Sequence, residues 1–362
     1  MQYSTFAAID IGSYDVILEI FEISKKQGIR SVDKICHRME LGKDTYTLGK
    51  IRPEMEEELC RVLADFVRIM EGYRVDDYRA TASSAISEAS NSLYVLGKIH
   101  QLTGLSVTVL SNSEQRFLSY KALAAMEDNF NKIIEKGTAI LDLDGGSFQI
   151  SLFDKDALVT TQNIRMGSLR IRERLAGIQS ETEHYEEMVE ELIWNEVSSF
   201  KKMYLKDRKI ENIMLIGDVF TDSVYQNIEE KTTKIISREN FNTWYEKIIR
   251  QSPMELAVKL GIPLENASLM YPSAVIYKCL IDMMGAEHIW IPGVHMTRGI
   301  AYEYAEQMKL LKGGHNFEND ILMAAKNIGK RYAVNRPHVQ NLEMTALAMF
   351  DATKKMHGMK ER

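Results

Sequence analysis

The sequence has few cysteines, no long apolar run and no excess of basic residues. Three of its 362 residues are cysteines, and Cys36, Cys60 and Cys279 are scattered without CxxC spacing, which argues against a disulfide framework or a structural zinc site. No apolar run reaches the length of a membrane span, and the first residues enter a predicted strand without a signal-peptide pattern. The net charge of −6 gives no reason to expect general affinity for nucleic acid or anionic membranes. We therefore expect a cytoplasmic globular protein that binds neither.

The sequence does contain a distinctive segment at residues 138–155. An apolar run that includes Asp142 is followed by an alternating run, and the turn between them consists of Asp144, Gly145, Gly146 and Ser147. This pattern predicts a strand, a tight glycine turn and a second strand. Such glycines let backbone N–H groups approach a phosphate, and an aspartate at the strand end can hold a hydrated divalent cation or orient water. For this segment alone, an ordinary hairpin is an equally good interpretation.

The N-terminus repeats the same device. An apolar run containing Asp10 is followed by Gly12 and Ser13 and then by the apolar run 16–21. Two copies far apart in the chain predict a duplicated domain that supplies one phosphate loop from each half. The pair resembles the facing phosphate loops of the actin, sugar kinase and heat-shock chaperone superfamily. The predicted fold class is therefore α/β, with two ribonuclease H-like (actin-like) domains, a cleft between them and additional C-terminal helices.

Hydrophobic periodicity gives similar orders of elements in the two halves. In the first half we expect a hairpin at 6–24, strands at 34–41, 78–82 and 107–110, and helices at 53–71, 84–100 and 114–126. In the second half we expect a hairpin at 138–154, strands at 157–164, 213–217 and 288–292, and helices at 181–203, 238–250, 252–260, 272–285 and 298–310. We predict the domains at 1–125 and 126–312, followed by a helical segment at 313–362 with helices at 318–332 and 339–357.

Several short segments, taken in order, resemble the exopolyphosphatase / guanosine pentaphosphate phosphohydrolase family. They are residues 9–13, 82–91, 110–116, 142–149, 165–171 and 297–299. The resemblance implies a divalent cation, Mg²⁺ or another such as Mn²⁺, and removal of terminal phosphate from inorganic polyphosphate or guanosine pentaphosphate.

The resemblance also implies roles for individual residues. Glu114 falls where the family has its catalytic glutamate, and Asp10 and Asp142 would serve the metal and the water. The phosphates would be lined by Gly12, Ser13, Gly145, Gly146 and Ser147. A carboxylate can orient or deprotonate the attacking water, and charge on the phosphate oxygens must be neutralised.

The chain departs from the family pattern at four positions in the expected cleft. Gln149 replaces a glutamate, and glutamine can hold water but is a poor cation ligand and no base. Ser87 replaces an arginine, Tyr14 an asparagine, and Asp144 a glycine. Asp144 adds negative charge beside an anionic substrate, so it is a further candidate metal ligand. Four nearby cations could compensate this negative charge: Arg79, Arg116, Arg165 and Arg170. Arg116 is the candidate phosphate ligand among them. Each of the four could instead be a solvated or structural arginine.

Two functions remain open from the sequence. The first is a metal-dependent phosphohydrolase, whose activity the four departures could impair. The second is a degenerate member that binds polyphosphate or a guanosine penta- or tetraphosphate with little turnover. A nucleotide kinase is disfavoured, because the segment 213–220 offers only Gly217-Asp218 where a glycine pair is needed. We interpret His288 and His295, which flank the last expected strand, as structural.

The C-terminal residues resemble the start of the helical, HD-type third domain of longer family members. Two amphipathic helices cannot close a core of their own. We expect the segment 313–362 to be the beginning of a truncated domain. Its apolar stripe, which includes Leu342, Leu347, Met349 and Phe350, would be covered by the missing domain or by a second copy of the chain in a homodimer.

Overall fold

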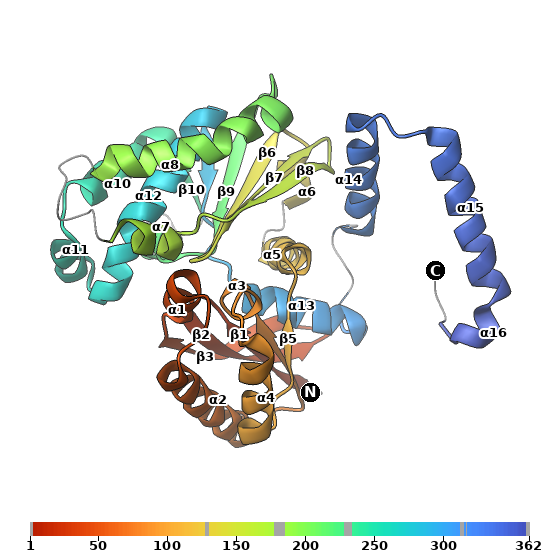
Figure 1. The fold of residues 1–362 in the computed structure, drawn as a ribbon, viewed down its shortest axis with the longest axis horizontal. Helices are drawn as coiled ribbons and strands as arrows, with labels where there is room; N and C mark the ends of the chain where they lie inside the picture. Colours follow the sequence, from red (N-terminus) through yellow and green to blue (C-terminus); the bar gives the residue numbers. More distant parts are fainter. Residues whose placement is uncertain are drawn as a thin grey trace.

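The computed structural model describes residues 3–126, 130–176, 185–227, 234–311, 315 and 317–359. Its elements form two domains, each built on one sheet, which lie one above the other with helices α5 and α13 between them (Figure 1). The expected boundary at 312–313 and the residues 181–184 of one expected helix lie outside the described residues.

The first sheet has the strand order β3-β2-β1-β4-β5. Its strands are β1 (Ser4–Ile11), β2 (Asp15–Ser24), β3 (Gly28–Arg38), β4 (Asp77–Ala82) and β5 (Val107–Val109). The first three strands are antiparallel neighbours, whereas β4 and β5 run parallel to β1. The centre of β1 is apolar on both faces because helices cover both, so Phe6 to Ile9 are fully buried.

The second sheet has the order β10-β11-β9-β6-β7-β8. Its strands are β6 (Thr138–Leu143), β7 (Phe148–Asp154), β8 (Ala157–Ile164), β9 (Asn212–Ile216), β10 (Ile235–Ser237) and β11 (His288–Trp290). The series β8-β7-β6-β9-β11 repeats the order and the strand directions of β3-β2-β1-β4-β5. The duplicated actin-like fold predicted from the two glycine turns is thus confirmed.

Helices surround both sheets. In the first half they are α1 (Leu41–Leu48), α2 (Pro53–Tyr73), α3 (Ser84–Ser87), α4 (Ser92–Thr103) and α5 (Asn112–Met126). In the second half they are α6 (Phe130–Ile134), α7 (Ser168–Leu175), α8 (Tyr185–Phe200) with a π-helical turn at Lys201–Leu205, α9 (Val219–Asn227), α10 (Arg238–Ile249), α11 (Pro253–Leu260), α12 (Leu264–Met284) and α13 (Met296–Gln307). The short helices α1 and α7 are not among the helices predicted from the sequence.

Two helices do not follow the expected division at residue 126. Helix α13 comes late in the chain but packs on the first sheet, where Ile300 and Ala301 join one buried cluster with Phe6 and Phe21. Helix α5 packs against the second sheet instead, through Tyr120 and its neighbours. Boundaries drawn at single positions in the chain therefore do not separate the two cores, and these helices connect the domains.

The C-terminal helices differ from each other in their packing. Helix α14 (Phe317–Arg331) lies against β8, where the Asn327 amide donates to the carbonyl oxygen of Val159 at 3.2 Å. Helices α15 (Arg336–Ala352) and α16 (Lys354–His357) extend away from both domains (Figure 1) and have no buried residue. Leu342 is 56% exposed and Met349 63% exposed, so this stripe is uncovered.

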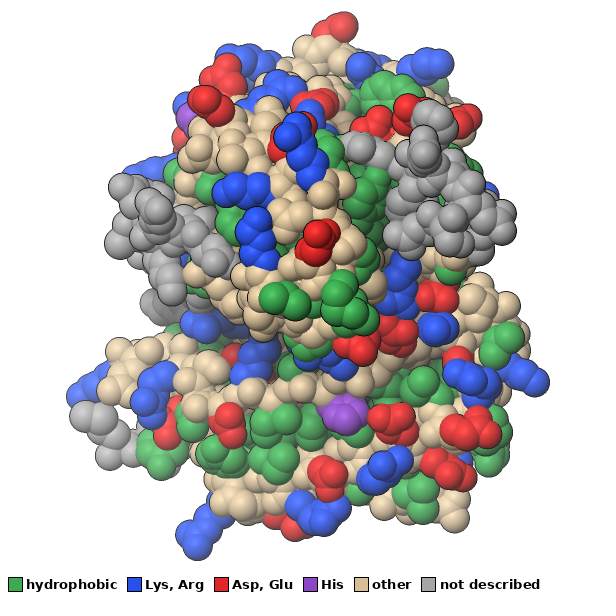
Figure 2. All heavy atoms as spheres, turned by 90° about the vertical axis from the view of Figure 1, so that its left-hand side faces the viewer, with side chains coloured by type: hydrophobic (Ala, Val, Ile, Leu, Met, Phe, Trp, Pro, Cys, Tyr) green, Lys and Arg blue, Asp and Glu red, His purple; other side chains and the backbone are tan. Residues whose placement is uncertain are grey.

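Two observations on the described residues concern membranes and nucleic acid. No helix there has both the length and the apolar character needed to cross a bilayer. On the face shown in Figure 2, lysines and arginines are interspersed with acidic side chains rather than gathered in one basic patch.

Candidate functional site

A cavity of about 400 Å³ lies between the two domains. Its walls come from the ends of the central strands β1, β6 and β9, from the face of β2 and β3, and from the beginnings of α9, α12 and α13. Of the predicted site residues, those that line it are Asp10, Gly12, Asp142, Asp144, Gly145, Ser147 and Gln149. The two glycine turns of the sequence therefore meet at one cavity.

Asp10 and Asp142 occupy equivalent positions in the two domains. Each is the last residue but one of the central strand of its sheet, with Asp10 paired to Ile17 and Asp142 paired to Gln149 on the adjacent antiparallel strand. Ser119 on α5 donates a hydrogen bond to the Asp142 carboxylate at 2.6 Å. The duplicated fold thus brings one carboxylate from each half to the same cavity.

The two glycine turns are each closed by a backbone hydrogen bond. The Gly12 N–H donates to the Asp15 carbonyl oxygen at 2.8 Å in the first loop, and the Asp144 N–H donates to the Ser147 carbonyl oxygen at 2.9 Å in the second. The Gly145 N–H already donates to the Asp144 side chain at 2.6 Å. Backbone donors of the second loop are therefore partly occupied by Asp144.

Ser13 and Gly146, predicted to line the phosphates, do not line the cavity. The Ser13 hydroxyl shares hydrogen bonds with the Tyr46 hydroxyl at 2.7 Å and with Ser84 at 3.1 Å. A side chain at Gly146 would place its Cβ 2.1 Å from the Tyr46 hydroxyl. The Ser13 hydroxyl thus contacts α1 and α3 of its own domain, whereas Gly146 packs against Tyr46 and Ser84 of the opposite domain, and neither residue has a place on the cavity wall.

Glu114 is also outside the cavity. It lies in the first turn of α5, is exposed, and forms a capping box in which its carboxylate accepts from the Ser111 N–H at 2.8 Å and the Ser111 hydroxyl at 2.7 Å. These hydrogen bonds hold the pKa of Glu114 below its usual value. The placement gives no support to the predicted catalytic role, because the next residue, Gln115, is the one that is buried and lines the cavity.

The four arginines expected to compensate the acidic loop are all directed elsewhere and do not line the cavity. Arg79 pairs with Glu303. Arg165 and Arg170 both pair with Glu88. The remaining one, the candidate phosphate ligand Arg116, donates to the Thr161 hydroxyl at 2.8 Å and to Ser113 at 3.0 Å. The interpretation of these residues as structural arginines fits the structure better.

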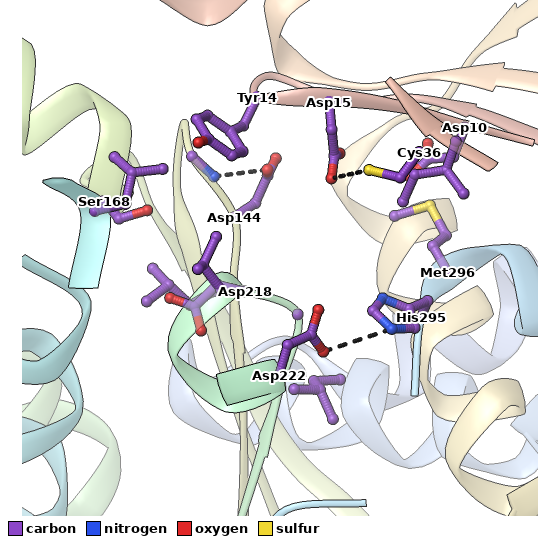
Figure 3. A pocket seen from close by; sticks show the side chains of 18 of the residues that line it. Asp10, Tyr14, Asp15, Cys36, Asp144, Ser168, Asp218, Asp222, His295 and Met296 are labelled. Atoms are coloured by element: carbon purple, nitrogen blue, oxygen red, sulfur yellow. Dashed lines mark hydrogen bonds and ion pairs between the residues drawn. The ribbon is translucent and has the colours of Figure 1, made fainter. Parts of the chain in front are cut away.

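Several acidic residues of the cavity wall were not predicted from the sequence. Asp15 follows the first loop, Asp218 follows β9, and Asp222 on α9 pairs with His295 at 3.5 Å. Figure 3 shows Asp218 and Asp222 on one side of the cavity, facing Asp15 on the first sheet, with His295 beside them. Asp218 had a visible signal, since it follows an apolar strand as Asp144 does. His295 lines the cavity as well.

The clustered aspartates are held in an environment that disfavours their charge. Desolvation by burial is the main cause in each case, and repulsion from neighbouring aspartates adds to it for Asp10, Asp144 and Asp218. The pKa of Asp10 is raised to about 8, with Asp15 and Asp144 contributing after burial. Burial raises the pKa of Asp218 to about 7 and the pKa values of Asp142 and Asp144 to about 6. A bound cation would remove this repulsion.

The cavity fits a hydrated divalent cation rather than an all-protein metal cage. Within the described ranges, no group of three or more His, Cys, Asp or Glu side chains is placed to hold one ion. Mg²⁺ in phosphate-handling sites is usually bound by one or two carboxylates together with water and substrate phosphates. The buried side-chain oxygens Gln149 Oε1 and Asp218 Oδ2 have no hydrogen-bond partner among the described residues. The oxygen-rich wall therefore fits such an ion.

The fold and the cavity together define a two-domain actin-like protein with a cavity between its halves that both glycine turns line. A family model described as the Ppx/GppA phosphatase family matches residues 19–308. This chain belongs to that family.

Individual curated proteins match this chain at low sequence identity. The chain is 21% identical over 310 residues to a bifunctional 3-dehydroquinate synthase/phosphatase of Fusobacterium nucleatum, covering 78% of this chain and 44% of that protein. It is 25% identical over 144 residues to exopolyphosphatase 1 of Mycobacterium leprae, covering 40% of this chain and 41% of that protein. The matches thus span less than half the length of either relative.

Solved structures support the same fold. The crystal structure of an exopolyphosphatase from Cytophaga hutchinsonii matches with a TM-score of 0.74 and 17% identity, covering 84% of this chain and 98% of that one. A Ppx/GppA family member from Aquifex aeolicus matches with a TM-score of 0.69 and 17% identity, covering 85% and 99%. At this identity, the likeness shows the fold.

Proposed function

We propose that this protein hydrolyses the terminal phosphoanhydride of inorganic polyphosphate or guanosine pentaphosphate with the help of Mg²⁺ or Mn²⁺. The observation that carries the proposal is the meeting of Asp10 and Asp142, at equivalent strand ends of the duplicated fold, in one cavity with both glycine loops. Membership of the Ppx/GppA phosphatase family supports the same reaction class.

The reaction needs a bound phosphate, neutralised charge and an activated water. Backbone at Gly12 and Gly145 can approach the terminal phosphate closely, because neither has a side chain. Asp10 and Asp142, with Asp144 as a third candidate, would hold the cation, which supplies neutralisation of charge on the phosphate oxygens. The water oxygen attacks the terminal phosphorus, the anhydride P–O bond breaks, and orthophosphate leaves with a chain that is one phosphate shorter.

The aspartates of the cavity wall can supply a proton acceptor for the attacking water. Gln149 and Gln115 line the cavity as amides, which can accept a hydrogen bond from water but cannot take its proton. Asp144 follows the strand end, and its pKa of about 6 leaves it mainly ionised at neutral pH. We assign it the role of orienting or deprotonating the water when it does not bind the cation.

The alternative function is a binding protein with little turnover. The observation that favours it is the same pair of amides on the cavity wall, together with Glu114 outside it. Such a protein would bind polyphosphate or a guanosine penta- or tetraphosphate at the same loops. A cytoplasmic location and a homodimer stay predictions under either function.

Phosphate release measured with malachite green separates the two functions. Wild-type protein and Asp142→Asn are compared on polyphosphate and guanosine pentaphosphate, with Mg²⁺, with Mn²⁺ and with EDTA. Hydrolysis predicts metal-dependent release that the variant loses. Binding of these compounds by calorimetry without any release favours the alternative, and the absence of both binding and release refutes both.

A further inference from the structure

One wall of the cavity is formed by alternate residues of the edge strand β3. Lys34, Cys36 and Arg38 all line the cavity, because side chains two residues apart on a strand share one face. All three are exposed. Lys34 and Arg38 are the lysine and the arginine among the described residues that line the cavity.

The strand register fixes how far these cations lie from the acidic centre. Asp10 on β1 is paired with Ile17 on β2, and Ile17 is paired with Cys36 on β3. Two strand spacings therefore separate Cys36 from Asp10 by about 10 Å across the sheet. Lys34 and Arg38 lie two residues to either side of Cys36 along β3, so each is about 12 Å from Asp10. A ligand with its reacting end at Asp10 must extend across β2 to reach them.

Both cations are available to a ligand. No ion pair to Lys34 or Arg38 is formed within the part of the chain that the structure describes. The acid opposite Lys34, Glu19, is buried and accepts hydrogen bonds from Ser31 at 2.6 Å and Thr297 at 2.5 Å.

The residues beside Arg38 also leave its side chain available to a ligand. Asp15, directly opposite on β2, accepts from the Cys36 thiol at 3.4 Å. Burial and the neighbouring Asp15 raise the pKa of that thiol to about 12. Cys36 therefore adds no negative charge between the two cations.

We propose that Lys34 and Arg38 form an outer anion subsite that binds a second, non-reacting phosphate group of the substrate while its terminal phosphate lies at Asp10 and Asp142. Arginine can bind a phosphate through two parallel hydrogen bonds and lysine as a point charge. On a polyphosphate the group would be a phosphate several units along the chain. On guanosine pentaphosphate it would be the diphosphate on the opposite side of the ribose. The placement of the terminal phosphate rests on the proposed function.

The subsite is tested with Lys34→Gln, Arg38→Gln and the double variant, against the control Lys26→Gln. Lys26 lies exposed in the β2–β3 turn and does not line the cavity. Two substrate pairs are compared: long-chain polyphosphate with tripolyphosphate, and guanosine pentaphosphate with guanosine triphosphate. The longer member of each pair reaches β3, and the shorter one lacks the distal phosphate group.

The double variant is expected to raise KM at least about tenfold for the longer member, which corresponds to about 1.4 kcal/mol, because it removes both charge-assisted contacts to the distal phosphate. Values of kcat, and KM for the shorter member, should stay close to wild type. The salt dependence of KM for the longer member should also weaken. Conservative exchange, Lys34→Arg with Arg38→Lys, should restore most of the affinity.

Two results overturn the proposal: an unchanged KM for both longer substrates, or equal losses on the longer and shorter members. Which pair responds identifies the ligand. If wild-type protein releases no phosphate, calorimetric titration of the same variants with the same four compounds replaces KM by Kd. The subsite can then be supported even if the protein hydrolyses none of these compounds. If the double variant binds the longer compounds with the same Kd as wild type, the subsite is refuted.

Discussion

The substitution Gln149→Glu tests the acidic centre most directly. Gln149 is 5% exposed, lies on β7 directly opposite Asp142 on β6, and has a side-chain oxygen without a hydrogen-bond partner among the described residues. A glutamate of nearly the same size therefore fits, and it places a second carboxylate beside Asp142. The change alters charge with little change in packing.

The magnitude follows from the strand geometry. Paired residues on antiparallel strands have Cβ atoms about 5 Å apart, and two unit charges at about that distance repel by about 3 kcal/mol at an effective dielectric constant of about 20. The metal-free variant should therefore be less stable than wild type by up to about 3 kcal/mol when both carboxylates are ionised.

The pH dependence has a definite sign. Burial and the neighbouring Asp142 would raise the folded-state pKa of the introduced carboxyl group above its unfolded value of about 4.3. Below that unfolded value, the new carboxyl group is protonated in both states and the two proteins should be equally stable. The difference then grows as the pH rises toward the folded-state pKa, because the unfolded state ionises more easily. The pKa of Asp142, about 6 in the wild type, should rise as well.

A divalent cation should reverse the effect. A cation that bridges the two carboxylates removes their repulsion, so Mg²⁺ should stabilise the variant more than the wild type. If a missing base limits turnover, the variant should release phosphate about 10²- to 10⁴-fold faster.

Thermal unfolding at pH 5 and pH 8, with and without Mg²⁺, measures the first effect, and malachite green measures the second. Gln101→Glu on the exposed face of α4 is the matched control. A variant as stable as wild type at pH 8 without metal would show that residues 142 and 149 do not share one electrostatic environment. A variant no faster at any metal concentration would show that the amide is not what limits turnover.

Three further predictions concern Glu114, Asp10 and the C-terminal helices α15 and α16. Glu114→Ala should lower the midpoint of thermal unfolding by removing the capping box with Ser111 but leave phosphate release unchanged; loss of turnover in a folded variant would restore Glu114 to the mechanism. Because the pKa of Asp10 is raised to about 8, Mg²⁺ binding must displace a proton at neutral pH, so affinity should increase from pH 6 to pH 9 and calorimetric heats should depend on the buffer; pH-independent affinity would exclude Asp10 as a ligand. Removal of residues 336–357 should convert a dimer to a monomer by light scattering, and an unchanged particle mass would exclude a dimer held by these helices.

Much of the fold was predictable because its central strands are strongly patterned. The hairpins at both glycine turns and the strand 157–164 agree with the structure, since alternation and turn glycines are local signals. Helix α12 was expected only from residue 272, where a proline suggests a start, but it begins at Leu264 and contains Pro272. This helix is apolar around most of its circumference, so its burial between α7, α8 and the second sheet outweighs the effect of the proline.

Site residues were predictable from the sequence only where they belong to short local motifs. Asp10, Asp142 and the loop glycines belong to short motifs, and the structure brings them to the cavity. Glu114 and its neighbour Gln115 show the limit, because one residue along a helix turns a side chain by about 100°. A match over a whole segment cannot decide whether Glu114 or Gln115 points into the cavity. Lys34 and Arg38 became visible only through the register of β3 on β2, which no local pattern specifies.

The balance of charge on the cavity wall has a consequence for the order of binding. The described wall carries six carboxyl groups but few basic side chains. The carboxyl groups belong to Asp10, Asp15, Asp142, Asp144, Asp218 and Asp222, and the basic side chains to Lys34, Arg38 and His295. A polyphosphate entering this cavity without a cation would meet net repulsion at its reacting end, although β3 would attract its distal part. Substrate should therefore enter as its divalent-cation complex, or follow a cation already bound, while Lys34 and Arg38 hold the portion that the cation does not neutralise.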